Sequence, residues 1–78
     1  MKYYDIQWTG KDDIDDKIRS AFIHIKLEIN IAYKKETIRN KYNMPRSFWF
    51  IKKEEKIFNK ILESYPDVFE YFKEKIAI

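Results

Sequence analysis

The amino-acid sequence predicts an α+β fold, in which a two-stranded antiparallel ribbon packs against two or three C-terminal helices. Residues 23–31 alternate strictly between Ile or Leu and polar residues, which is the period of a strand with one buried and one solvated face. After residue 34 the apolar residues instead recur at helical spacing. A chain of 78 residues is expected to form a single domain, spanning residues 1–78.

The first strand is predicted over about residues 2–9. Tyr4, Ile6 and Trp8 lie at alternate positions, so they would share one face of that strand. Gly10 is the only glycine in the chain and follows this segment directly. We therefore expect Gly10 to form a turn with a positive φ angle.

Four aspartates follow that turn and favour a short helix over about residues 13–20. Carboxylates in a first helical turn are stabilised by the positive end of the helix dipole. The alternative is a longer hairpin arm that runs directly into the second strand. The segment lacks the glycine and the closing glutamate of an EF-hand loop, so we expect a solvated acidic segment and no metal site. The aspartates are Asp12, Asp13, Asp15 and Asp16.

The alternating segment predicts the second strand, over about residues 22–33. Its apolar positions are mostly Ile, whose branched side chain favours a sheet. A helix is the alternative, because an apolar stripe at helical spacing also runs from Ile14 onward. That helix would leave Ile23, Leu27 and Ile31 on its polar side, so we prefer the strand.

Helices are predicted for the remainder of the chain. Asn43 and Pro45 end the first of them, and Ser47 is a suitable N-cap for the second, which carries a long apolar stripe. A short apolar strand over residues 48–51 is the alternative for the beginning of the second helix. The helices are expected at about residues 34–43, 47–65 and 66–76.

Composition excludes several classes of protein. The chain has no cysteine, which excludes disulfides and thiolate metal sites, and no apolar stretch long enough to span a membrane. The absence of a signal peptide and of cysteine fits a cytoplasmic protein. His24 is the only histidine and has no neighbouring nucleophile, and a single glycine leaves no phosphate-binding loop. We predict no catalytic, cofactor-binding or metal-binding residue, and no enzyme activity.

The leading hypothesis is a small non-enzymatic interaction protein that binds a protein partner. Aromatic residues make up 18% of the chain and would lie partly at an interface, unless they simply fill the core. Phage- or mobile-element-type inhibitors of host machines, such as anti-CRISPR proteins, share this size and composition. The open edges of a ribbon also favour a homodimer, or a homo-oligomeric structural or assembly protein. Protein contacts are predicted at His24, Lys26, Glu28, Asn30, Trp49 and Phe50.

A basic middle segment favours nucleic-acid binding as the alternative function. Residues 34–60 carry a net charge of +6, whereas residues 1–16 carry −3. Residues 35–49 resemble part of a helix-turn-helix unit with Asn43 at the turn, although Arg39 stands where a small residue is usual. The other interpretations are an ordinary helical corner and a basic surface that meets the acidic segment of the same chain. Nucleic-acid contacts are predicted at Lys35, Arg39, Lys41, Arg46, Ser47, Lys52 and Lys53.

Overall fold

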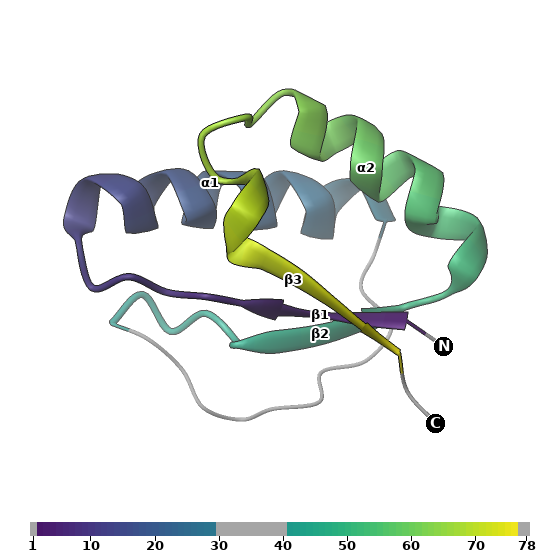
Figure 1. Cartoon of the computed structure of the whole chain (residues 1–78), viewed down its shortest axis with the longest axis horizontal. Coiled ribbons are helices and arrows are strands. Elements are labelled where there is room, and N and C mark those ends of the chain that lie inside the picture. Colours follow the sequence, from purple (N-terminus) through teal and green to yellow (C-terminus); the bar gives the residue numbers. More distant parts are fainter. Residues whose placement is uncertain (1, 30–40, 77–78) are drawn as a thin grey trace.

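The computed structural model describes residues 2–29 and 41–76, except for the side chain of Lys52. In these ranges three strands alternate with two α-helices and two short 3-10 helices (Figure 1). The predicted α+β class is confirmed, but the helices are interleaved with the strands instead of following them. The elements are β1 (Lys2–Ile6), α1 (Asp12–Ile29), β2 (Ser47–Phe50), η1 (Lys52–Glu54), α2 (Glu55–Glu63), η2 (Phe69–Tyr71) and β3 (Phe72–Ile76).

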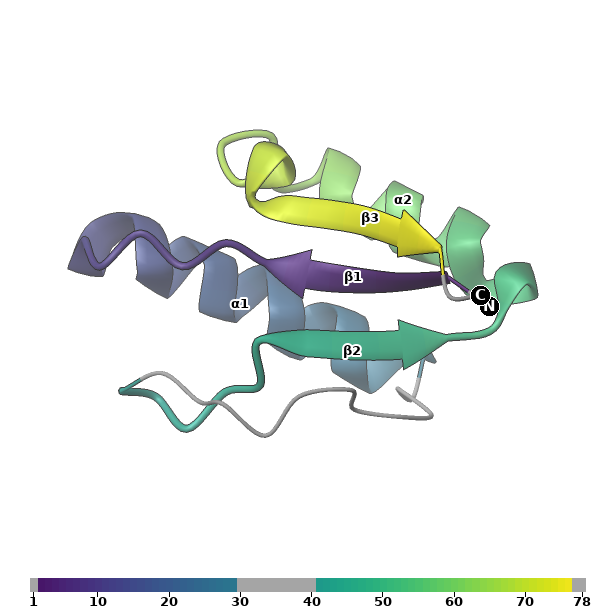
Figure 2. The ribbon, with the colours of Figure 1, turned by 60° about the horizontal axis from the view of Figure 1, so that its bottom comes forward.

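The strands form an antiparallel sheet in the order β2-β1-β3, with β1 in the centre. α1 and α2 pack side by side on one face of this sheet, and neither helix covers the other face (Figure 1). Figure 2 shows the sheet from the helix-free side, with both helices behind the strands. The predicted ribbon is therefore wrong, because β1 pairs with β2 and β3, whereas residues 22–29 of the predicted second strand are helical.

Aromatic side chains fill the space between the sheet and the helices. The ring centroid of Tyr4 lies 4.0 Å from that of Phe58 and 5.1 Å from that of Phe50. Phe22 of α1 meets Phe48 of β2 edge-on at 5.1 Å. All five side chains are buried, and full burial of a Phe stabilises a fold by about 1.5–3 kcal/mol. These aromatic residues therefore form the core, as one of the two interpretations of the aromatic content predicted.

One buried carboxylate holds the turn between β1 and α1. Asp15 accepts hydrogen bonds from the backbone N–H and the hydroxyl of Thr9, at 2.9 and 2.8 Å, and from the N–H of Gly10 at 3.0 Å. Gly10 has a φ of 81°, which confirms the predicted turn. α1 begins at Asp12, so the short helix predicted over residues 13–20 is confirmed as its first part.

α1 continues through the segment predicted as the second strand. That prediction is wrong for residues 22–29, whereas residues 30–33 lie outside the described residues. The helix packs a stripe of buried side chains against the sheet at the spacing of helical turns. The stripe consists of Ile18, Ala21, Phe22, Ile25 and Ile29.

Two aliphatic side chains are left on the outer surface of α1. Leu27 is 78% exposed and Ile23 is 36% exposed. These two residues complete the alternation over residues 23–29, because they stand between members of the buried helical stripe. The segment is helical because its apolar stripe begins at Ile18 and joins a single core cluster with the sheet. A strand over residues 22–33 would not include Ile18 in that stripe.

The C-terminal half contains less helix than predicted. β2 occupies the start of the segment predicted as a helix over residues 47–65, close to the alternative strand at 48–51, and only α2 is helical there besides η1. The helix predicted over residues 66–76 is wrong, because β3 takes its place. Of the helix predicted over residues 34–43, residues 34–40 lie outside the described ranges.

β3 forms because the central strand needs a second neighbour. Without β3, one edge of β1 would leave backbone N–H and C=O groups without partners inside the fold. The predicted helix would have buried Phe69 and Ile76 together with Phe72 on one face. In β3 only Phe72 is buried; Ile76 of the same strand and Phe69 of η2 are both exposed.

Candidate binding face of the sheet

The helix-free face of the sheet carries a definite set of side chains. Because successive residues of a strand point to opposite faces, the neighbours of the core residues project away from the helices. The strand register arranges them in two rows across the sheet. The first row is Trp49, Tyr3 and Lys75, and the second row is Ser47, Asp5 and Lys73.

An aromatic pair lies in the first row. Tyr3 and Trp49 are direct partners in the β1–β2 register, and their rings stack with centroids 4.9 Å apart and planes inclined by 27°. Both side chains are half-buried. Stacking of this kind contributes about 0.5–1.5 kcal/mol beyond the burial of the rings. The pair therefore presents two nearly parallel rings on the side of the sheet that the helices leave uncovered.

A buried carboxylate anchors the second row. The Lys75 ammonium donates a hydrogen bond to Asp5 over 2.8 Å, and the hydroxyl of Ser47 donates a second one. Burial alone would raise the pKa of Asp5, but the hydrogen bonds from Lys75 and Ser47 outweigh burial and lower it below its usual value. The same hydrogen bond raises the pKa of Lys75. Lys75 is therefore held charged and in place on this face.

Two further cations lie near that anchor. Lys73 is exposed on β3, and Arg46 is exposed directly before β2 and close enough to lower the pKa of Asp5. Neither forms an ion pair with a described residue. Among the described residues the face thus holds three cations against one carboxylate, with two lysines on β3, Arg46 directly before β2, and the aromatic pair in the row of Lys75.

The residues predicted to share a strand face lie elsewhere. His24, Lys26 and Glu28 are on α1, on the opposite side of the sheet, and Asn30 is outside the described residues. His24 Nδ1 lies 3.2 Å from the hydroxyl of Tyr65. The prediction that these residues form one exposed strand face is therefore wrong.

A groove runs between the two helices and includes some of these residues. It is a cavity of about 390 Å³, and a second cavity of about 380 Å³, which shares Ser64 with it, lies between α1 and the segment that follows α2. His24 and Glu28 line one wall of the groove, and Ile57 and Lys60 line the other. The groove lies on the far side of the molecule from the Tyr3–Trp49 pair.

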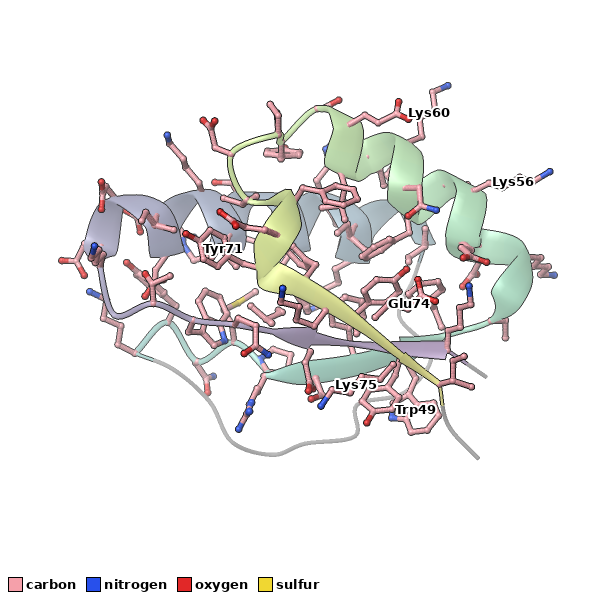
Figure 3. All side chains as sticks on the ribbon, in the orientation of Figure 1. Trp49, Lys56, Lys60, Tyr71, Glu74 and Lys75 are labelled. Atoms are coloured by element: carbon pink, nitrogen blue, oxygen red, sulfur yellow. The ribbon has the colours of Figure 1, made fainter. Side chains whose placement is uncertain are left out.

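Trp49 and Phe50 point to opposite faces of β2. Phe50 is fully buried in the core, which leaves it no role in a surface contact. Trp49 lies on the helix-free face, as Figure 3 shows together with Lys75. Of this predicted pair, only Trp49 belongs to the candidate binding face.

The helix-turn-helix prediction is wrong, because β2 occupies the position of its second helix. Ser47 is buried and bonded to Asp5, and Lys41 forms an ion pair with Asp12. Arg46 joins the candidate face, and Lys53 is exposed at η1. Lys35, Arg39 and the side chain of Lys52 are outside what the structure describes.

The acidic segment is used within the chain. Asp12 pairs with Lys41, Asp15 holds the Thr9–Gly10 turn, and Asp16 accepts a hydrogen bond from Tyr42. The interpretation that basic residues meet this acidic segment is confirmed for Lys41. Within residues 2–29 and 41–76, no three acidic or histidine side chains gather as metal ligands would.

Sequence reasoning missed Lys73 and Lys75. The signal was weak, because Phe72 and Ile76 are four residues apart, as in a helix, and only the charges of the three residues between them alternate as in a strand. The predicted helical stripe through the same residues concealed it. Their proximity to Arg46 depends on the pairing of β3 with β1, which no local pattern indicates.

Comparisons with known proteins add no assignment. No family model matches the chain, and neither the curated proteins nor the solved structures returned a match. No helix in the described ranges is long and apolar enough to cross a membrane.

Proposed function

We propose that the chain is a non-enzymatic binding module that contacts an anionic macromolecule through the helix-free face of its sheet. One observation carries this proposal: both helices cover the same face, and the other face gathers Arg46, Lys73 and Lys75 around a single buried carboxylate. Cations held on a flat surface attract polyanions and accelerate their association.

The polar groups most suited to chemistry have structural roles. His24 contacts Tyr65, Asp15 holds the turn before α1, and Asp5 fixes Lys75. A general base needs access to a substrate proton, and these groups are committed to partners within the fold. This supports binding rather than catalysis as the function.

Heparin chromatography tests the proposal, with heparin as the polyanion. The double variant Arg46→Gln/Lys73→Gln removes two charges from the proposed face. The matched control Lys56→Gln/Lys60→Gln removes two charges from the outer side of α2, where both lysines project away from the sheet (Figure 3). We expect the first variant to elute at distinctly lower salt than the wild type, and the control to elute close to it. Equal shifts would show that net charge alone determines retention.

A second candidate function is protein contact through the outer surface of the helices. Leu27 and Ile57 are 78% and 46% exposed, on α1 and α2 respectively, and exposed aliphatic side chains of this kind mark protein interfaces when they cluster. A second copy of the chain is the partner that can be tested directly. Sedimentation velocity over a tenfold concentration range should show association that Leu27→Ser abolishes, and a constant sedimentation coefficient in the wild type would exclude it.

A further inference from the structure

We infer that the helix-free face binds single-stranded nucleic acid, with a base stacked on the Tyr3–Trp49 pair and phosphates held by Arg46, Lys73 and Lys75. The inference rests on the proposed function and names the class of its partner. It depends on the aromatic pair, which the proposal of a polyanion surface does not use.

The arrangement of charges suits an extended strand. Neighbouring strands of a sheet are about 4.8 Å apart, so β2 and β3 lie about 10 Å apart across β1. Arg46 lies on the β2 side, and Lys73 and Lys75 lie on β3. A nucleic-acid strand that crosses the sheet would meet cations on β3 and beside the start of β2, and aromatic rings in the row of Lys75.

The aromatic pair distinguishes nucleic acid from an acidic protein. Carboxylates of a protein partner would need only the three cations. Tyr3 and Trp49 add an aromatic stack, which a base can extend, in the same row as Lys75, and sheet surfaces with aromatic side chains are a recurrent platform for unpaired bases. Stacking tolerates any base, so binding with little sequence preference is expected.

The same geometry disfavours a duplex. Readout of duplex DNA usually places a helix or a two-stranded ribbon in the major groove. Both helices of this fold are on the opposite side of the sheet, so the cationic face is built on strands (Figure 2). Bases in a duplex are stacked on each other and would not reach the Tyr3–Trp49 pair.

Fluorescence of Trp49 provides a direct readout. Trp8→Phe leaves Trp49 as the only tryptophan. The buried Nε1 of Trp8 has no hydrogen-bond partner among the described residues, so Phe removes no described hydrogen bond. Titration of this variant with a twelve-nucleotide oligothymidylate at low salt should quench Trp49 and give saturable binding. Three phosphate contacts predict that log K falls with log salt at a slope of about −2.

Variants separate the two contributions. Arg46→Gln/Lys73→Gln should weaken binding at least tenfold and flatten the salt dependence, whereas Lys56→Gln/Lys60→Gln should leave both unchanged. Tyr3→Leu should weaken binding roughly tenfold without changing the salt slope, because it removes stacking only. Should the Tyr3 variant unfold, Trp49→Leu measured by anisotropy of a labelled oligonucleotide replaces it.

Each result decides between the proposals. Binding without quenching of Trp49, or equal affinity for a duplex of the same length, would overturn base stacking and leave the polyanion surface in place. Retention on heparin without any binding of oligothymidylate or oligouridylate would point to an acidic protein and overturn this inference alone. Failure to bind heparin as well would overturn the proposed function.

Discussion

Asp5 and Lys75 form an ion pair over 2.8 Å between the central strand and an edge strand, on the face that neither helix covers. The carboxylate is buried, whereas half of the lysine side chain is exposed. Asp5 is part of the folded structure, and Lys75 belongs to the proposed binding surface. Protonation of Asp5 should therefore affect both the stability of the fold and that surface.

Stability should fall at acidic pH in a way that depends on Asp5. Burial raises the pKa of Asp5, but the hydrogen bonds from Lys75 and Ser47 lower it further than burial raises it, and the folded pKa lies below the usual value of about 3.9. A lowered pKa contributes stability that is present above the unfolded pKa and is lost as the pH falls through the folded pKa. Thermal unfolding between pH 6 and pH 2 should therefore show a smaller decline in Asp5→Asn than in the wild type. Parallel pH profiles would contradict this.

Removal of the Asp15 carboxylate should destabilise the fold substantially. Asp15→Ala leaves the Thr9 and Gly10 N–H groups without the acceptor that they use, which typically costs about 1–3 kcal/mol. Asp13→Ala is the matched control, because Asp13 is exposed in the same helical turn and should change the free energy of unfolding by less than about 0.5 kcal/mol. Urea denaturation measures both. Equal effects would show that the charge near the helix dipole matters more than the turn.

Two phenylalanines on neighbouring segments should respond very differently to truncation. Phe58 of α2 is fully buried against Tyr4 and Phe50, so Phe58→Ala should cost about 3–5 kcal/mol and leave little folded protein at room temperature. Phe69 of η2 is 53% exposed, and Phe69→Ala should cost less than half as much. Circular dichroism during thermal unfolding distinguishes them. A similar loss for both would mean that Phe69 packs more closely than its exposure indicates.

The outer edge of β3 should resist pairing with a second copy of itself. Opposed residues of an antiparallel pair point to the same face, so two copies related by a twofold axis must pair one residue with its own copy. At the centre of β3 that residue is Lys73, Glu74 or Lys75, and each choice opposes like charges.

A double variant tests this charge pattern. Lys73→Glu/Glu74→Thr would place the new carboxylate opposite Lys75 of the other copy and threonine opposite threonine. Light scattering should then show a higher mass than for the wild type, with slower hydrogen exchange in β3. A wild type that already pairs through β3 would contradict the prediction.

Local patterns predicted those elements whose periodicity is unambiguous. Gly10 and the aspartates after it correctly indicated the turn and the start of α1. From Phe22 to Ile29, two periods coexist in the same residues, and only packing against the sheet decides between them. A sequence window cannot show that choice, because the sheet comes from residues far along the chain.

The candidate site was less predictable than the fold. The sequence indicates Arg46 and Trp49 as contact residues, but it predicts them for a helix or for a different surface. The face appears only when β3 pairs with β1 and brings Lys73 and Lys75 beside Asp5. Long-range pairing of this kind depends on unsatisfied edges of a sheet, which have no signature in the sequence of either strand.

The central position of β1 has a consequence for synthesis. Tyr4 donates a hydrogen bond to Glu74, which is 70 positions further along the chain. At about 5–20 residues per second, a ribosome takes several seconds to supply β3 after β1 has been made. Both edges of β1 can be paired only after β3 has been made. A fold with such distant contacts should form more slowly than a helical bundle of the same size.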